Sequence, residues 1–131
     1  MKTIGYIATV LLLFFARLSD AQICTKWIAP QTANDQQNPL VGNVAVLKDA
    51  QKIYTSLCTP CHGDKGRGDG PVAAVLNPGP ADHTSAVVQS ETDGALFWKL
   101  SNGRGQMQPY KAKLSDTQRW ALVNYIRSFR K

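Results

Sequence analysis

The segment Cys58-Thr59-Pro60-Cys61-His62, a CxxCH motif, limits what this chain can fold into more than any other part of its sequence. A thiol can add across a haem vinyl group to form a thioether, and two thiols three positions apart suit the two vinyls of one haem. The imidazole that follows directly can bind the iron from one side. The motif therefore predicts one covalent c-type haem (heme c), attached through Cys58 and Cys61, with His62 as an axial iron ligand.

Two other uses of paired cysteines fit the sequence less well. A structural zinc site needs four ligands, usually with a second Cys or His pair, and only Cys24 and His83 remain to supply them. A thioredoxin-like redox pair belongs in a βαβ unit, and no strand pattern flanks these cysteines. With two of its three cysteines in the motif, the chain also has too few for a disulfide framework.

The first residues have the pattern of a secretory signal. Lys2 gives a positive start, residues 4–16 are mostly apolar, and Ser19 and Ala21 are small residues that suit a cleavage site. The apolar stretch is shorter than the roughly 20 residues that span a bilayer as a helix. We expect residues 1–21 to be a cleaved signal peptide, with an uncleaved anchor as the alternative. The protein would then be exported to the periplasm or to the outer face of the cytoplasmic membrane.

We expect residues 22–45 to form an extended N-terminal arm and residues 46–131 to form a single small domain. The arm contains prolines and an Asn- and Gln-rich run, and it has no sustained helical or strand period. Trp27 and Leu40 are its expected anchors on the domain, although a loosely held arm fits the pattern equally well. Cys24 could carry a lipid, or it could remain a free or intermolecularly paired thiol.

Three main helices and no strands are expected in the domain, which makes its predicted class all-α. Apolar residues recur at three- and four-residue steps over residues 47–57, so Tyr54 lies on the same helix face as the first cysteine and brings its ring to the haem. A second helix is expected from residue 91 or 92 to residue 101. The last helix begins after Ser115, which predicts a capping box with Gln118, and it crosses the first helix.

The glycine-rich stretch over residues 63–70 lets the backbone pass close to a flat cofactor. A carbonyl group near this stretch is expected to accept the Nδ1–H of His62, which leaves Nε2 to face the iron. Pro71 is the first candidate for this acceptor, and Pro78 and Pro80 are the alternatives.

Met107 is the candidate for the second axial ligand. It lies in a Gly- and Gln-rich loop with little helical core to fill, and a thioether ligand favours ferrous iron and raises the reduction potential. His83 is the alternative ligand, although a lone histidine in the polar loop expected over residues 81–90 is usually solvated. Trp98 could border the haem or donate its indole N–H to a propionate, and ordinary core packing is an equal alternative.

Several motifs together resemble one family, the class I monohaem bacterial cytochromes c. They are an aromatic residue four positions before CxxCH, then HGxxGxGDGP, DGxLFW, NGRG with a nearby methionine, and LSDxxxWALVxYIRS near the C-terminus. The resemblance covers roughly residues 43–129 and implies the helical cytochrome c fold. By position, it implies haem thioethers at Cys58 and Cys61, axial ligands His62 and Met107, and a bond from His62 to the Pro71 carbonyl.

Two positions depart from the pattern of that family. Members usually have proline directly after the methionine, whereas here Gln108 stands between Met107 and Pro109, which alters the loop on that side of the haem. The first helix often has glycine where this chain has Ala50, which should loosen the crossing of the first and last helices slightly.

The expected function follows from the number of iron ligands. Iron bound by two protein ligands has no open position for oxygen, peroxide or substrate, so it suits the exchange of one electron. The residues therefore predict a non-enzymatic electron carrier between components of an extracytoplasmic respiratory chain. The alternatives are an electron-entry subunit of a larger membrane oxidoreductase complex, and a haem sensor or peroxidase-like protein in which Met107 leaves the iron.

The formal net charge of +6 predicts a moderately basic surface, which suits a redox protein partner with an acidic docking surface. Basic residues around the haem-binding loops could steer such a partner, or they could serve solubility alone. They are Lys65, Arg67, Lys99, Arg104, Lys111 and Lys113. The sequence has no Lys/Arg run or recognition module that would predict nucleic-acid binding. Membrane association would come through a partner complex or through a lipid on Cys24.

Overall fold

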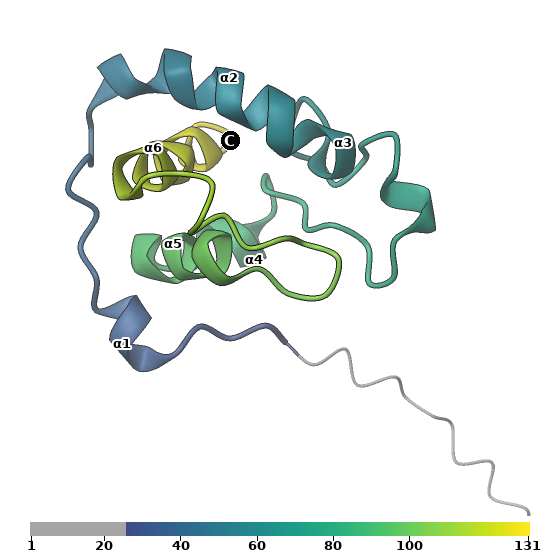
Figure 1. The fold of residues 1–131 in the computed structure, drawn as a ribbon, viewed down its shortest axis with the longest axis horizontal. Helices are drawn as coiled ribbons and strands as arrows, with labels where there is room; N and C mark the ends of the chain where they lie inside the picture. The colour runs from purple at the N-terminus through teal and green to yellow at the C-terminus, as the bar shows by residue number, and fades with distance from the viewer. Residues whose placement is uncertain (1–25) are drawn as a thin grey trace, which may run out of the picture.

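Helices supply the regular structure of the computed structural model, which describes residues 26–131 (Figure 1). Residues 26–131 contain no β-strand, and one isolated antiparallel bridge joins Arg104 to Met107. The all-α class predicted from the sequence is confirmed. The α-helices and the two 3-10 helices, labelled η, are, in chain order, α1 (Gln31–Asn34), η1 (Val44–Val46), α2 (Leu47–Leu57), α3 (Thr59–His62), η2 (Ala73–Val75), α4 (Ala86–Gln89), α5 (Asp93–Asn102) and α6 (Asp116–Arg127).

The first long helix, α2, packs across the last helix, α6 (Figure 1). α2 has the bounds that its apolar stripe predicts. Ala50 and Tyr54 on α2 are almost completely inaccessible to solvent, as are Leu122 and Val123 on α6. Close packing of these four side chains joins the two ends of the domain, and it holds the C-terminal end of α2 in a fixed position.

Hydroxyl side chains define where the later helices begin. α6 follows the predicted capping box, in which the Ser115 hydroxyl accepts the N–H of Gln118 and the Gln118 side chain accepts the N–H of Ser115. α5 is capped by Thr92, whose hydroxyl accepts a backbone N–H at 3.0 Å. The loop expected before it contains the short helix α4, capped by Ser85. Four residues are too few to show a helical period, which is why the sequence did not predict α4.

One apolar cluster, the main cluster, joins α2, α4, α5 and α6. The rings of Phe97 and Trp120 stack within it, with 3.9 Å between their centroids, which fixes α5 against α6. Leu40 from the N-terminal arm and Met107 from the loop after α5 pack against its edge. The buried members of the main cluster are Tyr54, Cys58, Val88, Leu96, Phe97, Leu100, Trp120, Leu122, Val123 and Ile126.

A second, smaller cluster holds the N-terminal arm against α5. The ring of Trp27 meets the ring of Trp98 edge-on, with 6.3 Å between centroids. Because Leu40 also contacts the main cluster, both expected anchors of the arm lie against the domain. The members of this second cluster are Ala29, Ala33 and Ala95, with Trp98 packed against them.

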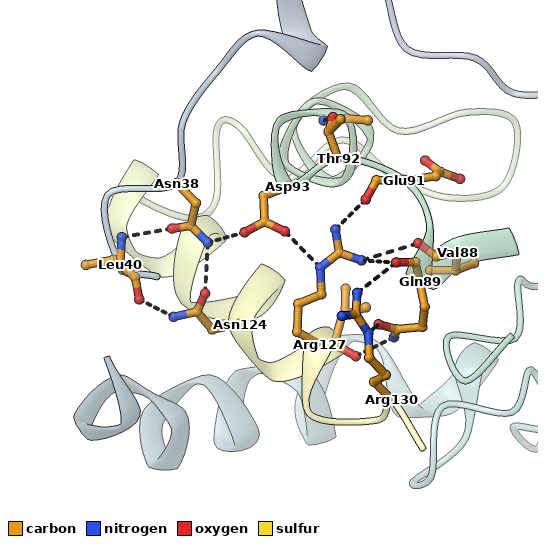
Figure 2. A network of polar contacts seen from close by, with 12 residues as sticks. Asn38, Leu40, Val88, Gln89, Glu91, Thr92, Asp93, Asn124, Arg127 and Arg130 are labelled. Atoms are coloured by element: carbon orange, nitrogen blue, oxygen red, sulfur yellow. Dashed lines mark hydrogen bonds and ion pairs between the residues drawn. The ribbon is translucent and has the colours of Figure 1, made fainter. Parts of the chain in front are cut away.

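Asn38 connects the arm to α5 and α6 through hydrogen bonds (Figure 2). Its amide group donates to the carboxylate of Asp93 and to the side-chain oxygen of Asn124, both at 2.8 Å. Its oxygen accepts the N–H of Leu40 at 2.9 Å, and Asn124 donates to the Leu40 carbonyl at 2.6 Å. These bonds explain how a polar segment without a regular period keeps a fixed position.

Arg127 extends this network to the connection between α4 and α5 (Figure 2). Its Nε donates to Asp93 at 2.8 Å, and its terminal nitrogens donate to the carbonyl groups of Val88, Gln89 and Glu91. Backbone carbonyls removed from water need hydrogen-bond partners. Arg127 therefore adds hydrogen-bond donors to the carbonyls of an irregular segment.

None of the helices within residues 26–131 is long and apolar enough to cross a membrane. The predicted signal peptide and Cys24 lie outside the described residues.

Replacing Arg127 with methionine tests whether this network stabilises the fold. The Arg127→Met variant should lower the free energy of unfolding by about 2–3 kcal/mol, because the Glu91 carbonyl loses its donor and the partly buried Asp93 carboxylate loses its cation. The measurement is chemical denaturation followed by far-UV circular dichroism. Lys52→Met removes a cation from an exposed ion pair on α2 and should change stability little. Equal effects of the two substitutions would contradict a stabilising role for the network.

Candidate functional site

The CxxCH segment lies where α2 ends and α3 begins. The N–H of Cys58 donates to the carbonyl of Tyr54 at 2.8 Å, and the N–H of His62 donates to the carbonyl of Cys58 at 2.8 Å. Cys58 is buried and Cys61 is half-buried, and both are free thiols. Since Cys58 belongs to the main cluster, the packing of α2 on α6 fixes the position of this thiol.

The two thiols of the motif have different surroundings. Burial, with a smaller contribution from negative charge on Cys61, raises the pKa of the Cys58 thiol to about 12. Cys58 is therefore a neutral thiol near pH 7.

The imidazole of His62 is oriented by a backbone carbonyl. Its Nδ1–H donates to the carbonyl oxygen of Ala81 at 2.9 Å, which leaves Nε2 as the nitrogen available to a metal. Burial lowers the pKa of His62, and the bond to Ala81 opposes part of this change. The ring is therefore neutral near pH 7, in the form that can bind iron.

The acceptor for His62 is Ala81, and not Pro71 or the alternatives Pro78 and Pro80. The residues on either side of Pro71 lie instead against backbone carbonyls of α3. A Cβ atom on Gly70 would lie only 2.4 Å from the carbonyl oxygen of Pro60, and Val72 donates to that same oxygen at 3.1 Å. The chain reaches the imidazole only after the following turn, one residue beyond Pro80.

His83 is buried against the His62 ring, which corrects the expectation of a solvated side chain. The two imidazoles stack with 4.1 Å between centroids and 19° between planes. The Tyr54 hydroxyl lies 2.9 Å from Nδ1 of His83. Burial first, and then the proximity of His62, lowers the pKa of His83 to about 3. A second axial ligand must lie across the iron from Nε2 of His62, so a ring stacked face to face on His62 does not fit that role.

Local sequence patterns did not predict the position of His83. One signal was present: a tyrosine on the buried face of a helix needs a partner for its hydroxyl. Tyr54 is such a residue, and burial raises the pKa of its phenol. The sequence does not say which residue supplies that partner.

The loop that carries Met107 is anchored beside the end of α2. Gly103 ends α5 with a positive φ of 61°, and a Cβ atom there would lie 2.3 Å from the Met107 carbonyl oxygen. Met107 exchanges two backbone hydrogen bonds with Arg104, at 2.9 and 3.0 Å. The Tyr110 hydroxyl then donates to the carbonyl of Leu57, next to Cys58, at 3.2 Å. The loop is therefore held at the end of the molecule that carries the CxxCH segment.

Gln108, the residue that separates Met107 from Pro109, is accommodated at the surface. It is exposed, and its side chain contacts the ammonium group of Lys113 and the Tyr110 hydroxyl. Trp98 lies in the second cluster with the arm, so its contacts favour ordinary packing over a position at the haem.

These side chains form a donor set that suits a c-type haem. Two free thiols lie on one helical turn, and a neutral imidazole next to them has Nδ1 already bonded. A thioether, Met107, comes from a loop tied to the same helix end. Imidazole and thioether are the ligand types that hold iron in cytochromes c.

Comparison with known families agrees with this site. Residues 45–126, more than half of the chain, match the family model described as cytochrome c oxidase, cbb3-type, subunit III. The chain therefore belongs to this family, whose model describes a c-type cytochrome domain. It binds haem c covalently, and proteins of this class transfer electrons. No curated protein matches the sequence.

Solved structures of c-type cytochromes have the same fold. The KustC0563 c-type cytochrome is 27% identical with a TM-score of 0.56, over 63% of this chain and 98% of that chain. A mutant of the same protein is 26% identical with a TM-score of 0.55, and the match covers 63% of this chain and 99% of that chain. A chain of the Kuenenia stuttgartiensis reducing HAO-like protein complex Kustc0457/Kustc0458 is 28% identical with a TM-score of 0.59. That match covers 67% of this chain and only 45% of the other.

Replacing Tyr110 with phenylalanine tests the anchor of the Met107 loop. The Tyr110→Phe variant should lower the free energy of unfolding by about 1 kcal/mol, because the Leu57 carbonyl loses its hydroxyl partner. Amide exchange should also become faster over residues 103–110 and remain unchanged in α6. The control is Tyr125→Phe, since the Tyr125 hydroxyl makes no hydrogen bond within the described part of the chain. Unchanged loop exchange in Tyr110→Phe would contradict the anchoring role.

Proposed function

We propose that this protein is a one-electron carrier whose haem is attached through Cys58 and Cys61, with His62 and Met107 as the axial ligands. The observation that carries the proposal is the orientation of His62. Its Nδ1 is bonded to Ala81, which leaves Nε2 for a metal, and the histidine directly follows two cysteines on one helical turn. The bound haem iron supplies the chemistry, which is a change between the ferric and ferrous states.

Each proposed ligand has a separate task. His62 and Met107 are both uncharged, and together they fill the two axial positions, which excludes oxygen, peroxide and other small ligands. The thioether of Met107 favours the ferrous state and so raises the reduction potential. The main cluster, which includes Cys58 and borders Met107, keeps water away and limits rearrangement when the iron charge changes.

The partners would be redox proteins with acidic docking surfaces. Lys65 and Arg67 lie exposed in the loop after His62, and Lys111 and Lys113 lie exposed after the Met107 loop. Positive groups in these loops would steer an acidic partner toward the haem. Lys99 is already paired with Glu91, and we assign it no such role. The carrier would act in an extracytoplasmic respiratory chain, in the periplasm or at the outer face of the cytoplasmic membrane.

A second candidate function is electron entry into a larger membrane oxidoreductase complex. Two observations favour it: the matching family model describes an oxidase subunit, and one similar solved chain belongs to a protein complex. Purification from membranes distinguishes the candidates, because a subunit would co-purify with an oxidase or reductase, whereas a free carrier would not.

The first test removes the proposed thioether ligand. Met107→Ala should abolish the sulfur-to-iron charge-transfer band of the ferric protein and lower the reduction potential by on the order of 100 mV, since axial ligands set haem potentials over about 0.8 V. The reduced variant should also bind carbon monoxide at neutral pH, which the native protein should resist. Gln108→Ala, an exposed neighbour in the same loop, is the control and should keep the band. Persistence of the band in Met107→Ala would mean that another sulfur binds the iron.

The second test removes the proposed attachment points. After expression with a haem-ligation system, the native protein should keep its haem on a denaturing gel stained for haem. The Cys58→Ala/Cys61→Ala double variant should lose that stain, and each single variant should keep part of it through the remaining thioether. A haem-stained band from the double variant would place the covalent bond elsewhere in the chain.

A further inference from the structure

His83 is held at several points around the His62 ring. Its N–H donates to the carbonyl of Gly66 at 2.6 Å, and its carbonyl accepts from the side chain of Gln89 at 2.7 Å. Its ring is bonded through Nδ1 to Tyr54. Backbone and side chain are therefore both fixed, and the ring cannot leave its stack on His62 without breaking a buried hydrogen bond.

Tyr54 connects this stack to the crossing of α2 and α6. Its ring packs against both Tyr125 and Phe129 of the C-terminal segment, with centroid distances of 5.1 and 5.3 Å. Its hydroxyl is buried, and His83 is its hydrogen-bond partner among the described residues. The hydroxyl and Nδ1 of His83 therefore share one buried hydrogen bond, whose direction depends on the tautomer of that imidazole. Packing in the core thus fixes the orientation of the His83 ring.

The His62 ring is constrained in two different ways by its neighbours. The bond to Ala81 fixes the direction in which Nδ1 points. A small rotation of the ring plane would keep this bond. The His83 ring lies parallel to that plane and limits such rotation. Groups that contact a metal-ligating histidine fix the orientation of its ring and alter the reduction potential of the metal. They also control the access of water to the site.

We propose that His83, fixed by Tyr54, is a positioning residue that sets the plane of the His62 imidazole on the iron and excludes water from its face. The proposal rests on the proposed function, in which His62 is the axial ligand. It adds a determinant of the reduction potential that does not touch the iron. A neighbour that keeps water from the ligand disfavours the ferric state, which carries the extra positive charge.

The test compares variants of the haem-loaded protein by two measurements. The reduction potential is measured by spectroelectrochemical titration. The g values of the frozen ferric protein, from electron paramagnetic resonance, report the orientation of the axial ligand planes. His83→Ala should shift the potential downward and change the g values, because the ring can rotate and water can enter. His83→Phe keeps a flat ring on His62 and should shift both quantities less than His83→Ala does.

Two further variants separate positioning from stability. Tyr54→Phe removes the bond to His83 and should move the g values in the same direction as His83→Ala, by a smaller amount. This variant also carries the test if His83→Ala fails to fold. Asn38→Ala removes hydrogen bonds to Asp93 and Asn124, neither of which contacts Tyr54, His62 or His83, so it should lower stability and leave both measurements unchanged.

Two outcomes would overturn the inference. One is a native potential and native g values in both His83→Ala and Tyr54→Phe. The other is an equal change in Asn38→Ala, which would mean that loss of stability alone moves these quantities. Failure of the proposed function would look different, because the native protein itself would then lack the sulfur-to-iron band or the covalent haem.

Discussion

The contact between α2 and α6 around Tyr54 supports the rest of this molecule. Burying an aromatic side chain of this size contributes about 1.5–3 kcal/mol. The same residue has two connections to the site, since its carbonyl accepts the N–H of Cys58 and its hydroxyl bonds to His83. A shift of α2 relative to α6 would therefore move a thiol of the attachment motif and the neighbour of the proposed iron ligand together.

The parts of the domain outside this crossing are held mainly by polar contacts. Between η2 and α5 the chain has only the one-turn helix α4, so many of its backbone groups need partners from elsewhere. Arg127 and Gln89 supply several of them, and Asn38 adds the N-terminal arm to the same network (Figure 2). The helical core thus positions the site, while a set of hydrogen bonds shapes the loop that carries Ala81 and His83.

The features that could be predicted from the sequence are those set by local patterns. The bounds of α2 follow from an apolar stripe, the start of α6 from a capping box, and the haem type from the spacing of two cysteines and a histidine. Ala81 and His83 could not be identified in this way, because their roles depend on how a glycine-rich loop folds back against α3. The docking of Asn38 depends in the same way on Asn124, far along the chain. Pairings between distant segments leave no periodic signal in either segment.

The burial of Cys58 has a consequence for the protein before its haem is attached. Two cysteines three positions apart readily close into a disulfide under oxidising conditions, and a closed pair cannot react with a vinyl group. Only a thiolate begins that exchange, and burial raises the pKa of Cys58, so that this thiol is neutral near pH 7. The packing of α2 on α6 therefore keeps Cys58 from beginning that exchange, and it does not protect the half-buried Cys61 in the same way.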